Sequence, residues 1–196
     1  MGYTENLIDF IGKSTDCYHA VKTAKDRLDE NGFTELFEGD KWDVQNDGKY
    51  YVIRNSSSII AFEMPKKDFG AFMICASHTD SPSFKLKPDF EINADGCIKL
   101  SVEGYGGMIM SSWLDRPLSI SGRIVNIDRD LLVIPSLAIH MSRDINKGYE
   151  FNIRRDMCPI ASEKNGRIED IIAENDNCMD TGFLTTPFLL DALCKI

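Results

Sequence analysis

The sequence lacks several features that would place it in common functional classes. No apolar run approaches the roughly 18 residues that a membrane span requires. The N-terminus, Met1-Gly2-Tyr3-Thr4-Glu5-Asn6, has neither the basic segment nor the apolar core of a signal peptide. Its 196 residues include 22 basic and 31 acidic side chains, a net charge of -9. Because such a surface repels phosphate backbones, nucleic acid is not expected as a partner. Because no apolar run is long enough to span it, a membrane is not expected either.

Paired cysteines are also missing. The chain has six cysteines, and no two of them form a Cys-x-x-Cys pair. Neither a zinc ribbon nor a disulfide framework is therefore predicted. Scattered thiols of this kind indicate reduced side chains in a cytoplasmic protein. The six are Cys17, Cys75, Cys97, Cys158, Cys178 and Cys194.

Helical spacing of apolar residues predicts two helices at the start of the chain. The first covers residues 6–12, and the second covers residues 16–30 with one buried face. Ser14 or Thr15 is the expected N-cap of the second helix, and Asn31-Gly32 its C-cap. His19 lies beside the apolar stripe and is expected to be a solvated surface side chain.

A strand pattern follows. Residues 49–54 and 58–63 are predicted to form a hairpin. Residues 71–76 are apolar throughout, which is typical of a strand covered on both faces of a sheet. This run stops at Ser77-His78-Thr79-Asp80-Ser81-Pro82. Polar side chains just past a buried strand lie where open α/β sheets place their chemistry.

After Pro88 the helical periodicity gives way to short strands punctuated by glycine, which predicts a β-rich sandwich or barrel. The candidate strands around this region are Ile98–Val102, Leu118–Val125, Leu131–Ile134 and Leu137–Met141.

The domain prediction has three parts. Residues 1–85 form an incomplete α/β domain, residues 86–174 form the β-rich domain, and residues 175–196 form an unassigned tail. Arg167–Ala173 is a candidate helix near the end of the β-rich domain.

His78 and Asp80 are candidates for a metal site. Residues two apart in an extended segment point the same way. The carboxylate can therefore accept a hydrogen bond from one imidazole nitrogen and leave the other for a metal. The alternative is an Asp that caps the turn before Pro82 and a His that bonds locally, because zinc needs three or four ligands.

Three stretches carry a family resemblance. The first is Ala76–Pro82 with Lys85–Pro88, the second Gly104–Gly107 with Trp113–Ser119 and Gly122-Arg123, and the third Ile134–Met141. In their order and separation they resemble the aspartyl aminopeptidase family of zinc metallopeptidases, over roughly residues 5–173.

The resemblance implies a large homo-oligomeric enzyme that removes Asp or Glu from peptide N-termini. It implies an α+β chain in which a β-rich dimerisation domain interrupts an α/β catalytic domain that binds two zinc ions. His78 would be a zinc ligand, Asp80 the catalytic-site carboxylate that orients it, and His140 a substrate-binding residue for a neighbouring subunit. A metal-activated water would attack the scissile carbonyl, with a glutamate as general base.

The chain lacks much of what that site needs. After His78 the only histidine is His140, and no Glu-Glu pair occurs. The implied general base and most zinc ligands are therefore absent from these 196 residues, and from about Asn175 onward the resemblance ends. We expect this truncated chain to bind zinc weakly or not at all. The apolar run Phe72–Ala76 would lack neighbouring strands and leave its faces exposed.

Three hypotheses are compatible with these observations. The chain is part of an aminopeptidase that is active only when complete, or it is a non-catalytic fragment that dimerises or joins a full-length homologue. An unrelated α+β binding protein is disfavoured by the three ordered stretches. At the level of local structure, Asp115 and Arg116 could form only an ion pair at a turn. Gly104, Gly106 and Gly107 are expected to give a tight loop its backbone freedom.

Overall fold

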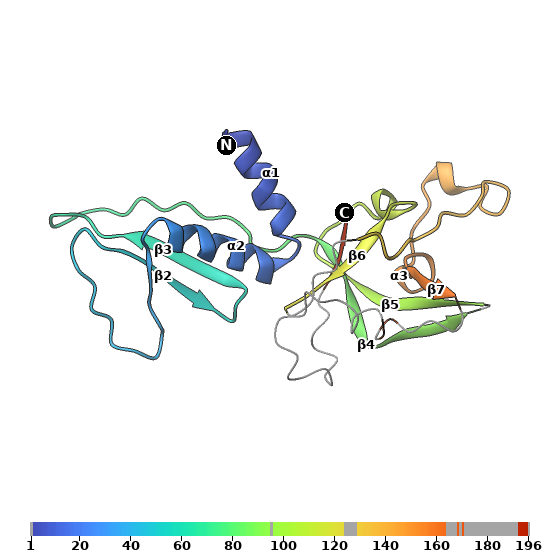
Figure 1. The fold of residues 1–196 in the computed structure, drawn as a ribbon. Coiled ribbons are helices and arrows are strands. Elements are labelled where there is room, and N and C mark those ends of the chain that lie inside the picture. The colour runs from blue at the N-terminus through green and yellow to red at the C-terminus, as the bar shows by residue number, and fades with distance from the viewer. Residues whose placement is uncertain are drawn as a thin grey trace. The chain divides into compact units, whose positions relative to one another are not determined.

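The computed structural model describes residues 2–94, 96–123, 129–163, 168, 170 and 192–195. The chain forms two compact units, Met1–Ser81 and Pro82–Ile196, each of mixed helix and strand with a small sheet (Figure 1). The division falls between Ser81 and Pro82, whereas the sequence pattern placed it near residue 86. Within the described ranges, no helix has the length and apolar character that crossing a membrane would take.

The first unit begins with two helices, α1 (Tyr3–Lys13) and α2 (Cys17–Glu30). Asp16 is the N-cap of α2, and its carboxylate accepts the His19 N–H at 2.8 Å. The prediction of Ser14 or Thr15 as this cap was therefore wrong. The predicted C-cap is confirmed, with Asn31 followed by Gly32 at φ +78°.

His19 is not the solvated side chain that the sequence predicted. Only 14% of its side chain is exposed, and its Nδ1 lies 2.9 Å from Oδ2 of Asp16, whose side chain is 4% exposed. The capping carboxylate thus binds both the backbone and the ring of the same histidine. His19 has a structural role at the start of α2.

The predicted hairpin is confirmed. β2 (Lys49–Arg54) pairs antiparallel with β3 (Ser58–Glu63), and the short β1 (Thr34–Glu35) pairs parallel with β2. Asn55 and Ser56 at the turn have φ values of +53° and +57°, which Asn tolerates well.

Tyr51 ties α2 to this sheet. Its ring is 1% exposed, and its hydroxyl donates to Oδ1 of Asp29 at 2.7 Å. Nζ of Lys25 binds the same hydroxyl and Oε2 of Glu35, the latter at 2.9 Å. One buried hydroxyl thereby joins a helix and two strands through charge-assisted hydrogen bonds, which are the stronger kind.

The apolar run at residues 71–76 is not a strand in this chain, contrary to the prediction. Phe72, Met73 and Ile74 are 80%, 102% and 83% exposed, which confirms the expectation that the run would lack a cover. A strand forms only where a neighbouring backbone completes its hydrogen bonds. The described residues provide no such ladder for this segment.

The second unit is built on a hairpin of β4 (Ser83–Ala94) and β5 (Cys97–Tyr105). Gly96 in the turn has φ +95°, as tight turns require. The register shifts between Leu86 and Glu91, around Pro88, so this proline lies inside a strand and does not end one.

Three further strands complete the sheet, whose order is β6-β8-β4-β5-β7. Among the described residues, β8 pairs with β4 at Phe84 and Leu193, and with β6 over four residues. The added strands are β6 (Leu118–Ser121), β7 (Ile160–Glu163) and β8 (Ala192–Lys195).

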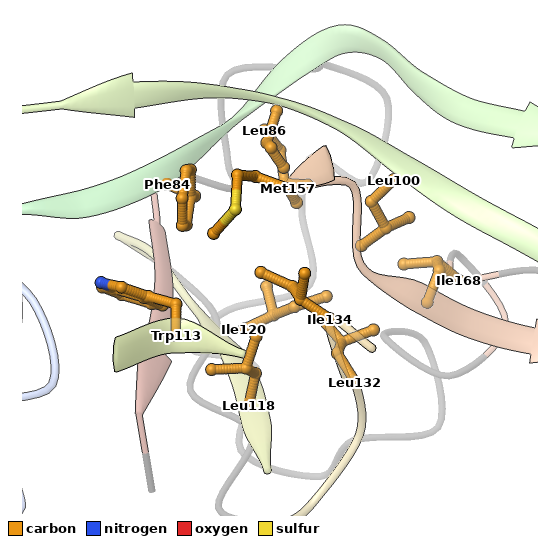
Figure 2. Close-up of a cluster of buried hydrophobic side chains, with 11 residues drawn as sticks. Phe84, Leu86, Leu100, Trp113, Leu118, Ile120, Leu132, Ile134, Met157 and Ile168 are labelled. Atoms are coloured by element: carbon orange, nitrogen blue, oxygen red, sulfur yellow. The ribbon is translucent and has the colours of Figure 1, made fainter. Parts of the chain in front are cut away.

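Among the described residues, the core of the second unit gathers a cluster of eleven buried side chains (Figure 2). The predicted alternation in β5 is confirmed, because Ile98, Leu100 and Val102 are 4%, 0% and 1% exposed. The Phe84 and Trp113 rings meet edge to face with centroids 5.0 Å apart. The cluster is Phe84, Leu86, Leu100, Val102, Trp113, Leu118, Ile120, Leu132, Ile134, Met157 and Ile168.

Two of the remaining predicted strands are absent from the structure, and other predicted elements lie outside the described residues. Residues 131–134 make isolated bridges through Leu132 and Val133, and residues 137–141 lie in a turn, so neither is a strand. Residues 124–128, much of the candidate helix 167–173 and most of the tail 175–196 lie outside the described residues. Short helices occur at η1 (Met110–Trp113), η2 (Ile145–Lys147) and α3 (Ile153–Asp156).

Candidate functional site

His78 and Asp80 lie together in the exposed loop that ends the first unit. Nδ1 of His78 is 2.9 Å from Oδ1 of Asp80, so the predicted side-chain pairing is present. The His78 side chain is 90% exposed and that of Asp80 is 35% exposed. The carboxylate occupies one ring nitrogen, which leaves Nε2 directed at solvent and available as a ligand.

Thr79, between them, anchors this loop to the hairpin. Its hydroxyl donates to the backbone oxygen of Ser57 at 2.8 Å. Ser57 belongs to the β2–β3 turn, so this hydrogen bond ties the loop that carries His78 to the hairpin. The hydrogen bond of Thr79 therefore fixes His78 and Asp80 next to the β2–β3 turn.

The described residues do not make a complete zinc site. Across the part of the chain that the structure describes, no group of three or more His, Cys, Asp or Glu side chains could hold a metal ion. Zinc takes three or four protein ligands in its structural and catalytic sites. His78 with its orienting carboxylate therefore fits one ligand position only, and no catalytic step can be derived from this chain alone.

His140 belongs to the second unit and lies in an exposed turn. The N–H groups of Met141 and Ser142 donate to the oxygen of Ala138 at 2.8 and 3.3 Å. Leu137, Ile139 and Met141 are 58%, 55% and 68% exposed. The structure thus brings His78 and Asp80 together, whereas His140 stands on a different unit among apolar side chains open to solvent.

The first two predicted stretches meet at the start of the second unit. Ser83 pairs with Tyr105 in the β4–β5 ladder. Next to it, Gly106 has φ +74°, and a Cβ there would lie 3.4 Å from the Cα of Pro82. Glycine is favoured at this position by the positive backbone angle, since a Cβ would reach Pro82 only at ordinary contact distance.

Asp115 has a partner that sequence reasoning missed. Its Oδ1 accepts the N–H of Ser136 at 2.8 Å, and its own N–H donates to the oxygen of Ile134 at 2.9 Å. Hydrogen bonds from the side chain and backbone of Ser136 hold the pKa of Asp115 below its usual range. The predicted ion pair with Arg116 is replaced by these contacts. No local signal reveals a partner 21 residues away.

Comparison with known proteins identifies the class as an aminopeptidase-type zinc metalloprotease. Residues 10–186 match the family described as "Aminopeptidase I zinc metalloprotease (M18)". The chain therefore belongs to the M18 peptidase family.

Individual relatives agree with this assignment. The chain is 43% identical over 187 residues to "Probable M18 family aminopeptidase 2" of Clostridium acetobutylicum, covering 85% of this chain and 42% of the relative. It is 37% identical over 185 residues to "Aspartyl aminopeptidase 4" of Saccharomyces cerevisiae, covering 85% and 38%. The chain thus spans about two fifths of the length of these relatives.

A solved structure shares the fold. In "Cryo-EM structure of the Ape4 and Nbr1 complex", one chain superposes with a TM-score of 0.83 at 32% identity. The match covers 96% of this chain and 42% of that one. The described elements therefore form a part of the M18 fold.

Proposed function

We propose that this chain contributes three residues to an aminopeptidase that removes N-terminal Asp or Glu from peptides. His78 supplies one zinc ligand, Asp80 orients its ring, and His140 contacts substrate bound to a neighbouring copy. The observation that carries the proposal is the 2.9 Å pairing of His78 with Asp80 within an M18 sequence. The aspartyl aminopeptidase among the relatives supports the acidic specificity.

Residues 1–196 by themselves do not catalyse this reaction. The sequence has no Glu-Glu pair, and only one histidine follows His78. The test is release of p-nitroaniline from Asp- and Glu-p-nitroanilide by the purified chain with added zinc. The S. cerevisiae relative, named an aspartyl aminopeptidase, serves as the positive control. We expect no release above background, and zinc-dependent release by the chain alone would overturn this part of the proposal.

Zinc binding is a separate measurement. One imidazole ligand gives weak affinity, because structural and catalytic sites use three or four. Calorimetric titration of the chain with zinc, beside a His78→Ala variant, is expected to show weak binding that the substitution removes. Tight binding that persists in the variant would contradict the role of His78.

The second candidate function is an interaction module that associates with copies of itself or with a full-length relative. The observation that favours it is the exposed apolar turn of Leu137, Ile139 and Met141. Apolar side chains gathered at a surface mark association sites. Sedimentation at micromolar concentration is expected to show a dimer or larger species, and a monomer would contradict this candidate.

A mixing experiment tests His140 itself. In the full-length C. acetobutylicum relative, the residue aligned with His140 is replaced by Phe. Adding this chain is expected to restore activity, and adding a His140→Phe variant of this chain is not. Equal restoration by both chains would show that His140 does not reach the neighbouring site.

A further inference from the structure

The segment that carries His140 leaves the core of the second unit at Ile134. This side chain is fully buried and lies in the same cluster as Trp113 (Figure 2). From Leu137 onward the segment is exposed and turns back at Ala138. The place of His140 therefore depends on how the base of the segment, residues 134–136, is held.

Asp115 holds this base with two hydrogen bonds of opposite polarity. Its N–H donates to the oxygen of Ile134, and its carboxylate accepts the N–H of Ser136. Between these two residues lies Pro135, whose ring fixes φ near -65°. The base is therefore bound at both ends by one residue and stiffened in the middle.

The backbone of Asp115 adopts a conformation that side chains seldom take. Its φ is +54°, in the left-handed region where Asp and Asn are the most tolerant residues after glycine. Such a conformation costs free energy and persists where the surroundings require it. Two residues before Asp115, the Trp113 ring packs against Phe84. The left-handed turn then directs both the N–H and the carboxylate of Asp115 to residues 134–136.

We infer that Asp115 is a positioning residue that fixes the base of the His140 segment and acts on substrate only through that histidine. Its consequence for catalysis rests on the proposed function, because it requires that His140 contact substrate. That Asp115 fixes residues 134–136 follows from contacts within the second unit alone.

Two substitutions separate the carboxylate from the backbone angle. Asp115→Gly removes the acceptor and adopts positive φ without strain. Asp115→Asn keeps an oxygen acceptor and still tolerates positive φ. A role in positioning predicts a defect in the glycine variant that asparagine largely rescues, whereas a need for the angle alone predicts that glycine is harmless.

Amide hydrogen exchange in the full 196-residue chain is the direct test. Losing a hydrogen bond to a charged acceptor should raise exchange at Ser136 by about tenfold or more in Asp115→Gly. The hydrogen-bonded amides of Met141 and Ser142 should follow, while the β5 amides of Leu100 and Val102 keep their wild-type rates. Unchanged exchange at residues 136–142 overturns the inference. An increase shared equally with β5 also overturns it, because Asp115 would then act only on global stability.

The mixing experiment provides the functional readout. With substrate assayed over a range of concentrations, Asp115→Gly is expected to raise KM more than it lowers kcat, and Asp115→Asn to behave like the wild-type chain. Equal values for all three chains would overturn the catalytic consequence. If the wild-type chain restores no activity, the proposed role of His140 fails, and the exchange result still decides whether Asp115 holds the segment.

Discussion

Replacing Ile74 with alanine tests whether the apolar run at residues 71–76 is packed in this chain. The Ile74 side chain is 83% exposed. Truncating isoleucine in a packed core costs about 2–5 kcal/mol, from lost burial and the cavity left behind. A side chain already in water has neither contribution to lose. We therefore expect the free energy of unfolding to change by less than about 0.5 kcal/mol.

Val21→Ala is the matched control in the same unit. Val21 lies in α2 and is 2% exposed, so its truncation should cost about 1–3 kcal/mol. Native-state hydrogen exchange at the β2 amides of Tyr50 and Val52, which face β3, reports the stability of this unit for both variants. A loss above about 1 kcal/mol for Ile74→Ala would show that the run is buried and refute the reasoning.

Two further predictions concern charged networks. Tyr51→Phe should lower the free energy of unfolding of the first unit by about 1–2 kcal/mol at pH 7, because a buried hydroxyl bound to charged groups is lost. The Tyr51 hydroxyl lowers the pKa of Asp29. The stabilisation from this hydrogen bond is therefore present above pH 3.8, the ordinary pKa of Asp, and is lost as the pH falls through the lowered pKa of the folded state. A difference in unfolding free energy between wild type and variant that stays constant on acidification would contradict this. Arg155 holds the pKa of Asp156 at about 2. This carboxylate therefore stabilises the second unit fully above pH 3.8, and the stabilisation is lost as the pH falls towards 2. Asp156→Asn should flatten that part of the profile of Tm against pH, and an unchanged profile would exclude the mechanism.

The elements that could be predicted from sequence are those specified by neighbouring residues. The β2–β3 hairpin needs only two strand patterns and a three-residue turn between them, and its bounds were found as predicted. The β5 alternation is equally local, because one face of a strand shows as every second residue. Helix α2 was located for the same reason, although its cap was misplaced because Asp16 follows two other competent capping residues.

The features that could not be predicted depend on distant partners. The run at residues 71–76 reads as a buried strand, yet whether it becomes one depends on strands that its own sequence does not specify. At the candidate site, the pairing of His78 with Asp80 was predictable because two residues decide it. The contact between Asp115 and Ser136 was not, because the fold alone brings those positions together.

The irregularity at Pro88 affects how the second unit meets other sheets. On the side of β4 that faces away from β5, the described residues include one pairing with β8, at Phe84. Open strand edges invite pairing with another chain, and proline offers no N–H for it. Lys87 and Asp89 flank the proline with charge. Pro88 and the charges beside it therefore disfavour pairing between this stretch of β4 and a strand of another chain.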